Sequence, residues 1–292
     1  MVRKLILSLL LLAPFLGKAQ SFFAIKRPRN LAVYGGTGTS AYLGELTNPG
    51  SMGRIRYNLV AGAEFFIIPR LTLRGEAIWF RVAGSDKYAD DDRVERNLSF
   101  FSNCQELSLG GTFYFLPEPK AFYQRRLFNV YAFAGVGAFR FNPKAEYQGK
   151  TYALQPLQTE NVAYSRTSLV FPYGLGIRLQ ATPLFNILID GGYRTTFTDR
   201  IDDISVHRYV DPSLLKSDLS RALADRRRER DPDYPVAPNY GVRGNPKKND
   251  GYFLMNIKVQ YYLPTSLFSK RGYNKVYRNK RKAFNPERRR RR

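Results

Sequence analysis

Hydrophobic and polar residues alternate along the chain in a series of long segments. The clearest example is residues 71–82, where Leu71, Leu73 and Trp79 fall on one face and Arg74 and Glu76 on the other. A period of two is typical of β-strands, because successive side chains of a strand point to opposite faces. The pattern predicts eight strands, at residues 30–38, 57–68, 71–82, 105–116, 128–141, 168–180, 186–197 and 251–263.

Most of these segments are about 10–13 residues long, which suits a tilted strand that crosses a bilayer. The connections between them alternate in length, with two residues after the second strand but some fifty after the seventh. Short turns at one end and long loops at the other are typical of outer-membrane barrels. We therefore predict an all-β fold, an eight-stranded antiparallel transmembrane β-barrel over residues 20–263 with long external loops. A soluble sandwich or a lipocalin-like barrel is the alternative, since it shows the same alternation.

The first 19 residues have the features of a secretory signal peptide. They combine a basic start, an apolar stretch from Leu5 to Leu16, and small residues at Gly17 and Ala19. The apolar stretch is too short for a membrane-spanning helix. The signal predicts export to the outer membrane, and an even number of strands then places both termini in the periplasm.

Residues 264–292 are strongly basic, with Glu287 as their single acid. Their apolar residues are too scattered to form a core, so we expect a largely disordered periplasmic tail. The tail is predicted to dock an acidic partner through its lysines and arginines. These are Lys270, Arg271, Lys275, Arg278, Lys280, Arg281, Lys282, Arg288, Arg289, Arg290, Arg291 and Arg292.

A formal net charge of +23 requires acidic counterparts. Because an exported protein does not meet cytosolic DNA or RNA, we expect no nucleic-acid partner, and lipid head groups, lipopolysaccharide and acidic proteins take its place. The chain has one cysteine (Cys104) and one histidine (His207). A single cysteine cannot form an internal disulfide, and the two residues offer few ligands for structural zinc and few groups for histidine-based catalysis. We expect no cofactor and no small-molecule substrate. The enzymatic alternative is a triad of His207 with Ser205 and a nearby aspartate.

Eight charged residues are predicted to point into the lumen, four acids and four bases. They are Glu64, Arg74, Glu76, Glu106, Arg178, Asp190, Arg194 and Lys258. An eight-stranded barrel is just wide enough for side chains to fill, and an unpaired charge inside it costs several kcal/mol. The equal numbers therefore predict a plug of ion pairs rather than a conducting pore. A base beside each acid also disfavours catalysis by a carboxylic acid, since it lowers the pKa.

Five stretches resemble a known family. They are GGTGTSAYLGEL (35–46), EFFIIPRLTLRGE (64–76), YALQPLQTENVAYS (152–165), GGYRTTFTDRIDDISVHRYVDP (191–212) and RGNPKKNDGYF (243–253). Together they resemble Bacteroidetes outer-membrane β-barrels that include the PorG-type component of the type IX secretion system. The resemblance implies a non-enzymatic barrel that ties a periplasmic ring, built from a lipoprotein and its partner, to the outer membrane. A small porin or structural barrel with no secretion role is the alternative.

The resemblance also implies that polar residues of the last two stretches fold the long loop at 199–250. These residues are Asp202, Asp203, Tyr209, Asp211, Arg243, Lys248, Asn249 and Asp250. A separate acidic cluster, Asp86 with Asp90, Asp91 and Asp92, is expected to pair with Arg93 and Arg96 rather than to bind a divalent cation.

Overall fold

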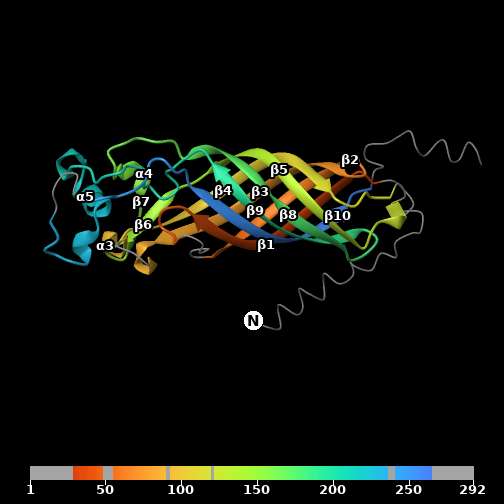
Figure 1. Cartoon of the computed structure of the whole chain (residues 1–292), viewed down its shortest axis with the longest axis horizontal. Coiled ribbons are helices and arrows are strands. Elements are labelled where there is room, and N and C mark those ends of the chain that lie inside the picture. Colours follow the sequence, from red (N-terminus) through yellow and green to blue (C-terminus); the bar gives the residue numbers. More distant parts are fainter. Residues whose placement is uncertain (1–28, 49–54, 90–92, 120–121, 236–240, 265–292) are drawn as a thin grey trace, which may run out of the picture.

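The computed structural model of the chain describes residues 29–48, 55–89, 93–119, 122–235 and 241–264. Its main body is a β-barrel that continues at one end into a cap of loops and short helices (Figure 1). The predicted signal peptide and all twelve basic residues of the predicted tail lie outside the described residues.

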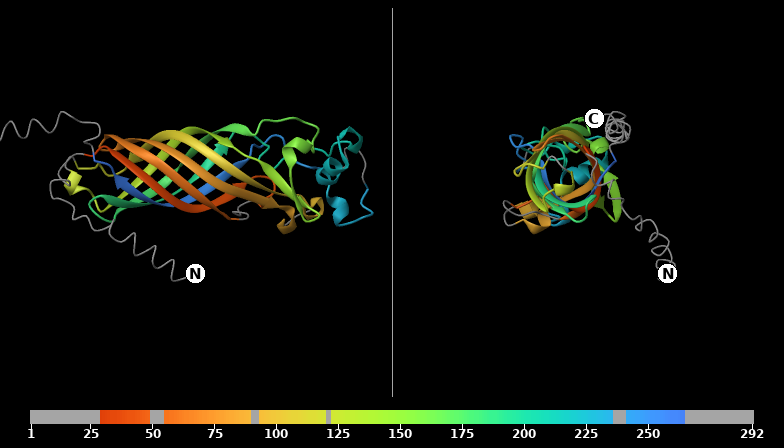
Figure 2. Two further views of the ribbon diagram at one scale, coloured as in Figure 1. Left: turned by 180° about the vertical axis from the view of Figure 1, so that it is seen from behind. Right: turned by 90° about the vertical axis from the view of Figure 1, so that its right-hand side faces the viewer.

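Eight long strands form the barrel, each antiparallel to both of its neighbours. They are β1 (Leu31–Leu43), β2 (Arg56–Ile68), β3 (Leu71–Ser85), β4 (Ser99–Tyr114), β5 (Phe128–Arg140), β8 (Thr167–Gln180), β9 (Phe185–Thr196) and β10 (Gly251–Tyr262). Each strand pairs with the next of the eight along the chain, and β1 pairs with β10, which closes the ring. The end-on view of Figure 2 shows this closure. The predicted eight-stranded antiparallel barrel is confirmed.

The wall of the barrel is apolar on the outside and, around its centre, polar on the inside. In β3, Arg74 and Glu76 are buried, whereas Leu73 and Trp79 are 44% and 49% exposed. Large apolar side chains cover the outer wall, among them Leu59, Phe65, Leu107, Leu109, Leu169, Leu175, Met255, Ile257 and Val259. Soluble monomers rarely expose a continuous apolar surface of this extent. The outer wall therefore faces lipid, and the soluble alternative is wrong.

Three strands extend further toward the cap than predicted. β1 ends at Leu43 instead of residue 38, β3 ends at Ser85 instead of 82, and β4 begins at Ser99 instead of 105. In β1 the inward positions continue as Ser40 and Tyr42, but the outward positions Thr39 and Ala41 are polar or small. The hydrogen-bonded ladder therefore runs on after the lipid-facing pattern has stopped, which is why the sequence pattern made these strands too short at the cap end.

The long connections fold into the cap. It contains η2 (Asp86–Tyr88), α3 (Arg93–Arg96), β6 (Pro143–Tyr147), β7 (Lys150–Ala153), α4 (Leu154–Leu157), η4 (Pro212–Leu214), α5 (Asp218–Ala224) and η5 (Arg227–Glu229). A further turn, η3 (Phe122–Gln124), lies at the opposite end of the barrel, where the short turns are (Figure 1). Among the described residues, no helix has both the length and the hydrophobicity needed to span a membrane.

A hairpin of β6 and β7 lies where a loop was expected. β6 pairs with the cap end of β4, through Phe101 with Lys144 and Ser102 with Pro143. Its two-residue turn, Gln148–Gly149, has φ angles of 47° and 74°. Turns with two positive φ angles match the twist of a hairpin, and glycine adopts them readily. β4 thus serves both as a wall of the barrel and as a support for the cap.

Candidate functional site

Four charged side chains meet at the centre of the barrel. The Lys258 Nζ lies 2.6 Å from Glu76 Oε1 and 2.7 Å from Asp190 Oδ2. The Arg74 Nη2 lies 2.6 Å and 3.0 Å from the same two oxygens. Each of the four side chains is buried. Because they come from β3, β9 and β10, the network spans the lumen and leaves two positive and two negative charges in balance.

A second, looser pair lies nearer the cap. The Arg194 Nε is 3.8 Å from Glu106 Oε2, and the Tyr252 hydroxyl donates to that same oxygen at 2.9 Å. Arg194 also donates from Nη1 to the Gly192 carbonyl at 2.7 Å. The 3.8 Å between Arg194 and Glu106 is longer than a charge-assisted hydrogen bond. The closer partner of Glu106 is therefore Tyr252, and that of Arg194 is the Gly192 carbonyl.

Glu64 and Arg178 do not pair as the equal count of charges implied. Glu64 accepts hydrogen bonds from neutral groups, the hydroxyls of Thr72 (2.5 Å) and Tyr114 (3.0 Å) and the Gln260 amide (2.5 Å).

Arg178 pairs instead with Glu118, which lies in the turn between β4 and β5. The alternating pattern could not identify Glu118, because a turn has no inward and outward faces. The lumen therefore holds a fifth acid, contributed from the short-turn end, and Glu64 is satisfied by hydrogen bonds rather than by a base.

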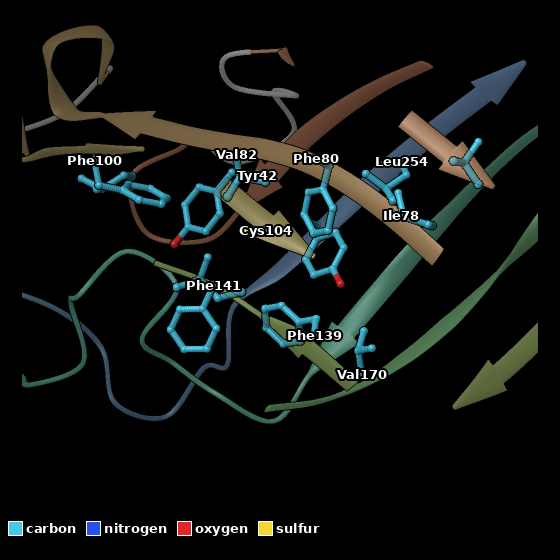
Figure 3. Packing of buried hydrophobic residues seen from close by; sticks show 14 of the residues in the cluster. Tyr42, Ile78, Phe80, Val82, Phe100, Cys104, Phe139, Phe141, Val170 and Leu254 are labelled. Carbon is cyan, nitrogen blue, oxygen red and sulfur yellow. The ribbon is translucent and has the colours of Figure 1, made fainter. Parts of the chain in front are cut away.

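An apolar layer separates the charged centre from the cap. After Glu76, the inward positions of β3 are Ile78, Phe80 and Val82, and all three are buried. They pack among aromatic side chains from other strands (Figure 3). The rings of Phe80 and Tyr252 lie 4.7 Å apart. Close packing of this kind leaves little room for water. The lumen is thus filled by a charged network at its centre and, toward the cap, by a mainly apolar layer that borders the Glu106–Arg194 pair.

The residues of the proposed triad are not assembled. The His207 Nδ1 lies 3.2 Å from the Gly244 carbonyl oxygen, and the Ser205 hydroxyl donates to Glu160. A nucleophilic triad needs the serine and the histidine within hydrogen-bond reach. Within the described ranges, no group of three or more His, Cys, Asp or Glu side chains is arranged to hold a metal ion.

In the cap, Tyr42 joins the two ends of the last long loop. Its hydroxyl lies 2.8 Å from Asp202 Oδ2 and 2.5 Å from Asp250 Oδ1. The other oxygens of these carboxyls accept the backbone N–H groups of Ile204 and Ile201. One hydroxyl proton can serve only one carboxylate. The second short contact therefore requires that one of the two carboxyls carry a proton of its own.

The electrostatics of the cap agree with a protonated carboxyl at Asp202 or Asp250. Burial raises the pKa of Asp202 and of Asp250 well above the ordinary value, and neighbouring carboxylates raise it further. Burial also raises the pKa of Asp199 to about 8, helped by the charges of Asp202 and Glu45. Both oxygens of the Asp199 carboxyl are buried without a hydrogen-bond partner.

A second cluster ties the last loop to residues 159–164. Asp203 has a positive φ of 66° and accepts hydrogen bonds from the Thr159 and Tyr164 hydroxyls, both at 2.5 Å. Burial raises the pKa of Asp203 to about 6, although these hydrogen bonds oppose the shift. Arg243 lies beside them, 3.1 Å from Thr159 Oγ1 and 3.5 Å from Glu160 Oε1.

Arg96 connects the β3–β4 loop to the same region. Its Nε and Nη2 each donate to Asp86 at 2.7 Å, and its Nη1 donates to the Arg243 carbonyl. The expected pairing of the acidic cluster is thus found for Asp86 and Arg96. Arg93 donates to the backbone carbonyls of Glu45 and Thr47 and to the side-chain oxygen of Asn48. Asp90, Asp91 and Asp92 lie outside the described residues.

The remaining residues expected to fold the last loop lie near its surface or under its helices. Tyr209 is buried beneath Arg227, whose guanidinium carbon is 3.9 Å from the ring centroid. Asp211 caps η4 by accepting from the Ser213 backbone N–H at 2.9 Å. Lys248 and Asn249 are exposed. The sequence pattern did not single out Tyr42, because it falls beyond the predicted end of the first strand.

The chain is thus a membrane-spanning β-barrel with a filled lumen and a folded cap. Neither protein-family models nor characterised proteins give a match. Several solved structures of outer-membrane proteins are similar in part. Ail of Yersinia pestis, in complex with the heparin analogue sucrose octasulfate, is 10% identical, with 81% of this chain and 100% of that one covered and a TM-score of 0.39.

For the Neisserial surface protein A the identity is 12%, with 80% and 97% of the chains covered and a TM-score of 0.40. For OprG of Pseudomonas aeruginosa it is 9%, with 81% and 98% covered and a TM-score of 0.36. The assignment of the fold rests on the strand pairing and on the burial pattern described above.

Proposed function

We propose that this protein is a non-enzymatic outer-membrane barrel that anchors a periplasmic assembly. The observation that carries the proposal is the filled lumen. Its central charges are paired across the barrel, and an apolar layer lies above them. Opening a path would expose several buried charges or break their pairing, at a cost of several kcal/mol. The barrel is therefore a rigid, filled scaffold, and the surfaces that can bind partners are at its two ends.

The short-turn end has the charge expected of a docking surface for an acidic partner. Arg70, Arg125 and Arg126 lie on the turns there. Of the acids, Glu118 is the one found in the described turns and strand ends on this side, and it is paired with Arg178. The described chain also begins and ends here, since the Leu263 N–H donates to the Leu31 carbonyl. The basic residues that follow Pro264 would add to the same surface.

The most specific form of the proposal is that the partner is the ring of a type IX secretion system. The proposal requires the barrel to be oriented with its long loops outside the cell. Both termini then face the periplasm, where the ring lipoprotein and its partner lie. The support is the resemblance of the stretches at 191–212 and 243–253 to PorG-type barrels. The same two stretches supply Asp202, Asp250 and Arg243 to the cap.

Affinity purification tests the anchor function. We would compare the full-length chain, a version that ends at Pro264, and an Arg70→Glu/Arg126→Glu variant, each extracted from native envelopes. The full-length chain should recover a defined set of periplasmic proteins. Both altered versions should recover less, and less still as salt is raised, because screening weakens contacts between exposed charges. Lys216→Glu is the matched control, because it reverses an exposed charge at the cap end.

If the truncated version recovers the same proteins as the full chain, the tail is not the docking element. If the full chain recovers nothing beyond what an unrelated barrel recovers, the anchor function is wrong. A small structural barrel with no secretion role would then account for the fold.

A further inference from the structure

A cavity of about 540 Å³ opens in the cap between the β1–β2 loop, α3 and the last long loop. Ligand pockets have volumes of about 300–1,000 Å³. The cavity is separate from the filled lumen, because its walls come from the loops alone. Its polar and aromatic lining includes Glu45, Arg96, Tyr209, Arg227, Tyr234 and Lys248.

Two buried polar atoms of this lining have no hydrogen-bond partner in the part of the chain that the structure describes. The Tyr209 side chain is buried, and its hydroxyl makes no hydrogen bond. Glu45 uses one carboxylate oxygen to accept the Asn245 backbone N–H, but its Oε2 is buried without a hydrogen bond, 3.9 Å from Arg96 Nη1. Buried polar groups are nearly always satisfied in native proteins, so each of these two atoms requires an explanation. One is a donor and the other an acceptor, and both residues line the same cavity.

The bases of the cavity are held in place before any ligand arrives. The Arg96 guanidinium is fixed by two hydrogen bonds to Asp86. The Arg227 guanidinium is fixed by Asp225 at 2.6 Å and 2.8 Å and lies over the rings of Tyr209 and Tyr234. Among the described residues, the charged lining comprises four bases and two acids. Pre-organised donors lower the entropic cost of binding, and the surplus of bases favours an anion.

The mixture of groups narrows the chemistry of the ligand. Glu45 would repel a simple anion such as phosphate, but its Oε2 suits a hydroxyl group. A polyhydroxylated ring with one anionic group would match both signs of charge, and its apolar face would pack against Tyr234. We propose that this cavity binds an acidic sugar, that is, a hexose with a carboxylate or a phosphate group. Its anionic group lies toward Lys248 and the arginines, and its hydroxyls meet Tyr209 and Glu45.

Titration calorimetry of the full-length protein in detergent micelles tests this site. The probes are glucuronic acid, glucose 6-phosphate, glucose and inorganic phosphate. The two acidic sugars should bind at least about tenfold more tightly than glucose or phosphate, because only they engage both kinds of group. An oligosaccharide that contains glucuronic acid separates the two sources. Tighter binding than the monosaccharide indicates a surface glycan, and equal binding indicates a free sugar.

Single substitutions then distinguish a binding role from a structural one. Tyr209→Phe removes a buried hydroxyl that makes no hydrogen bond in the free protein, so the thermal unfolding midpoint should stay the same or rise. Its affinity for glucuronic acid should fall about tenfold, because the hydroxyl would be satisfied only in the complex. Lys248→Met should weaken binding to a similar extent. Lys247→Met is the matched control, since Lys247 is also exposed but does not line the cavity.

Three results would overturn the site. The first is that neither acidic sugar binds the wild-type protein at up to about 10 mM, a concentration that would reveal even weak binding. The second is that phosphate binds as tightly as the sugars. The third is that Tyr209→Phe and Lys248→Met bind as the wild type does. None of these results depends on whether the short-turn end anchors a periplasmic assembly.

Discussion

Lys258 shows at the scale of one residue how the lumen is stabilised. It is fully buried, and its ammonium group lies within hydrogen-bond distance of two carboxylates that Arg74 also contacts. Taking such a group out of water is costly, and only excellent pairing offsets the cost. The Lys258 ion pairs therefore add little net stability, but removing Lys258 would leave two buried carboxylates without one of their bases.

We expect Lys258→Met to destabilise the barrel by about 3–5 kcal/mol. The substitution keeps most of the length of the side chain but leaves Glu76 and Asp190 with Arg74 as their remaining base. Urea unfolding in lipid vesicles, followed through the fluorescence of Trp79, measures the change, since the chain has a single tryptophan.

The neighbouring Val259→Met is the control for this substitution. Val259 is 54% exposed on the lipid-facing wall, so the same new side chain should change stability little there. Equal free energies of unfolding for the two variants would show that the ionic network does not hold the barrel together.

At the scale of elements, the cap is joined to the barrel through buried acidic residues whose pKa is raised. Tyr42 at the end of β1 meets Asp202 and Asp250, and Asp199 lies close by with Glu45 and Glu160, while Arg200 partly compensates. All these shifts raise the pKa of a carboxyl above its value in the unfolded chain. The folded cap therefore holds protons more tightly than the unfolded loop does.

The stability of the cap should accordingly fall as the pH rises. The pKa of Asp199 is about 8 in the fold against an ordinary value of 3.8, so the loss should extend from about pH 4 to about pH 8. Hydrogen exchange of residues 199–250, measured across that range, should show protection decreasing with pH. Above pH 8 the Asp199 carboxylate is charged in both states, and the dependence on Asp199 should end.

Asp199→Asn should flatten this pH profile, because an amide does not titrate. Asp233→Asn, in an exposed part of the same loop, should leave the profile unchanged. A profile of Asp199→Asn that matches the wild type across pH 4 to pH 8 would exclude Asp199 as its source.

At the scale of the whole molecule, the barrel is a closed body with distinct ends. The cap covers the long-loop end (Figure 2). Arginines lie on the turns of the opposite end, and side chains fill the lumen between the two ends. An eight-stranded barrel is just wide enough for side chains to fill its interior, so no open channel runs through the barrel that the described residues form.

Purified protein in a planar bilayer should therefore show no sustained open currents. The charged layer around Lys258 and the apolar layer around Phe80 would both have to separate before ions could pass. A porin inserted in the same bilayer serves as the positive control. Stable single-channel openings that scale with the amount of protein would show that the lumen conducts.

The sequence pattern predicted the barrel well because a lipid-facing strand must repeat its apolar positions every second residue. β2, β8, β9 and β10 therefore begin and end within two residues of their predicted limits. The cap follows no such period. The β6–β7 hairpin and the meeting of Tyr42 with Asp202 and Asp250 depend on contacts between residues far apart in the chain.

The sequence by itself determined the barrel, its number of strands and the charges that the strands point inward, because each strand has to match lipid on one face and the lumen on the other. Only the tertiary structure decided how those charges pair. Glu64 is satisfied by hydroxyl and amide groups, and Arg178 by Glu118 from a turn. It alone also decided that the cap contains a cavity with an unsatisfied tyrosine, since a cavity exists only once distant loops have packed together.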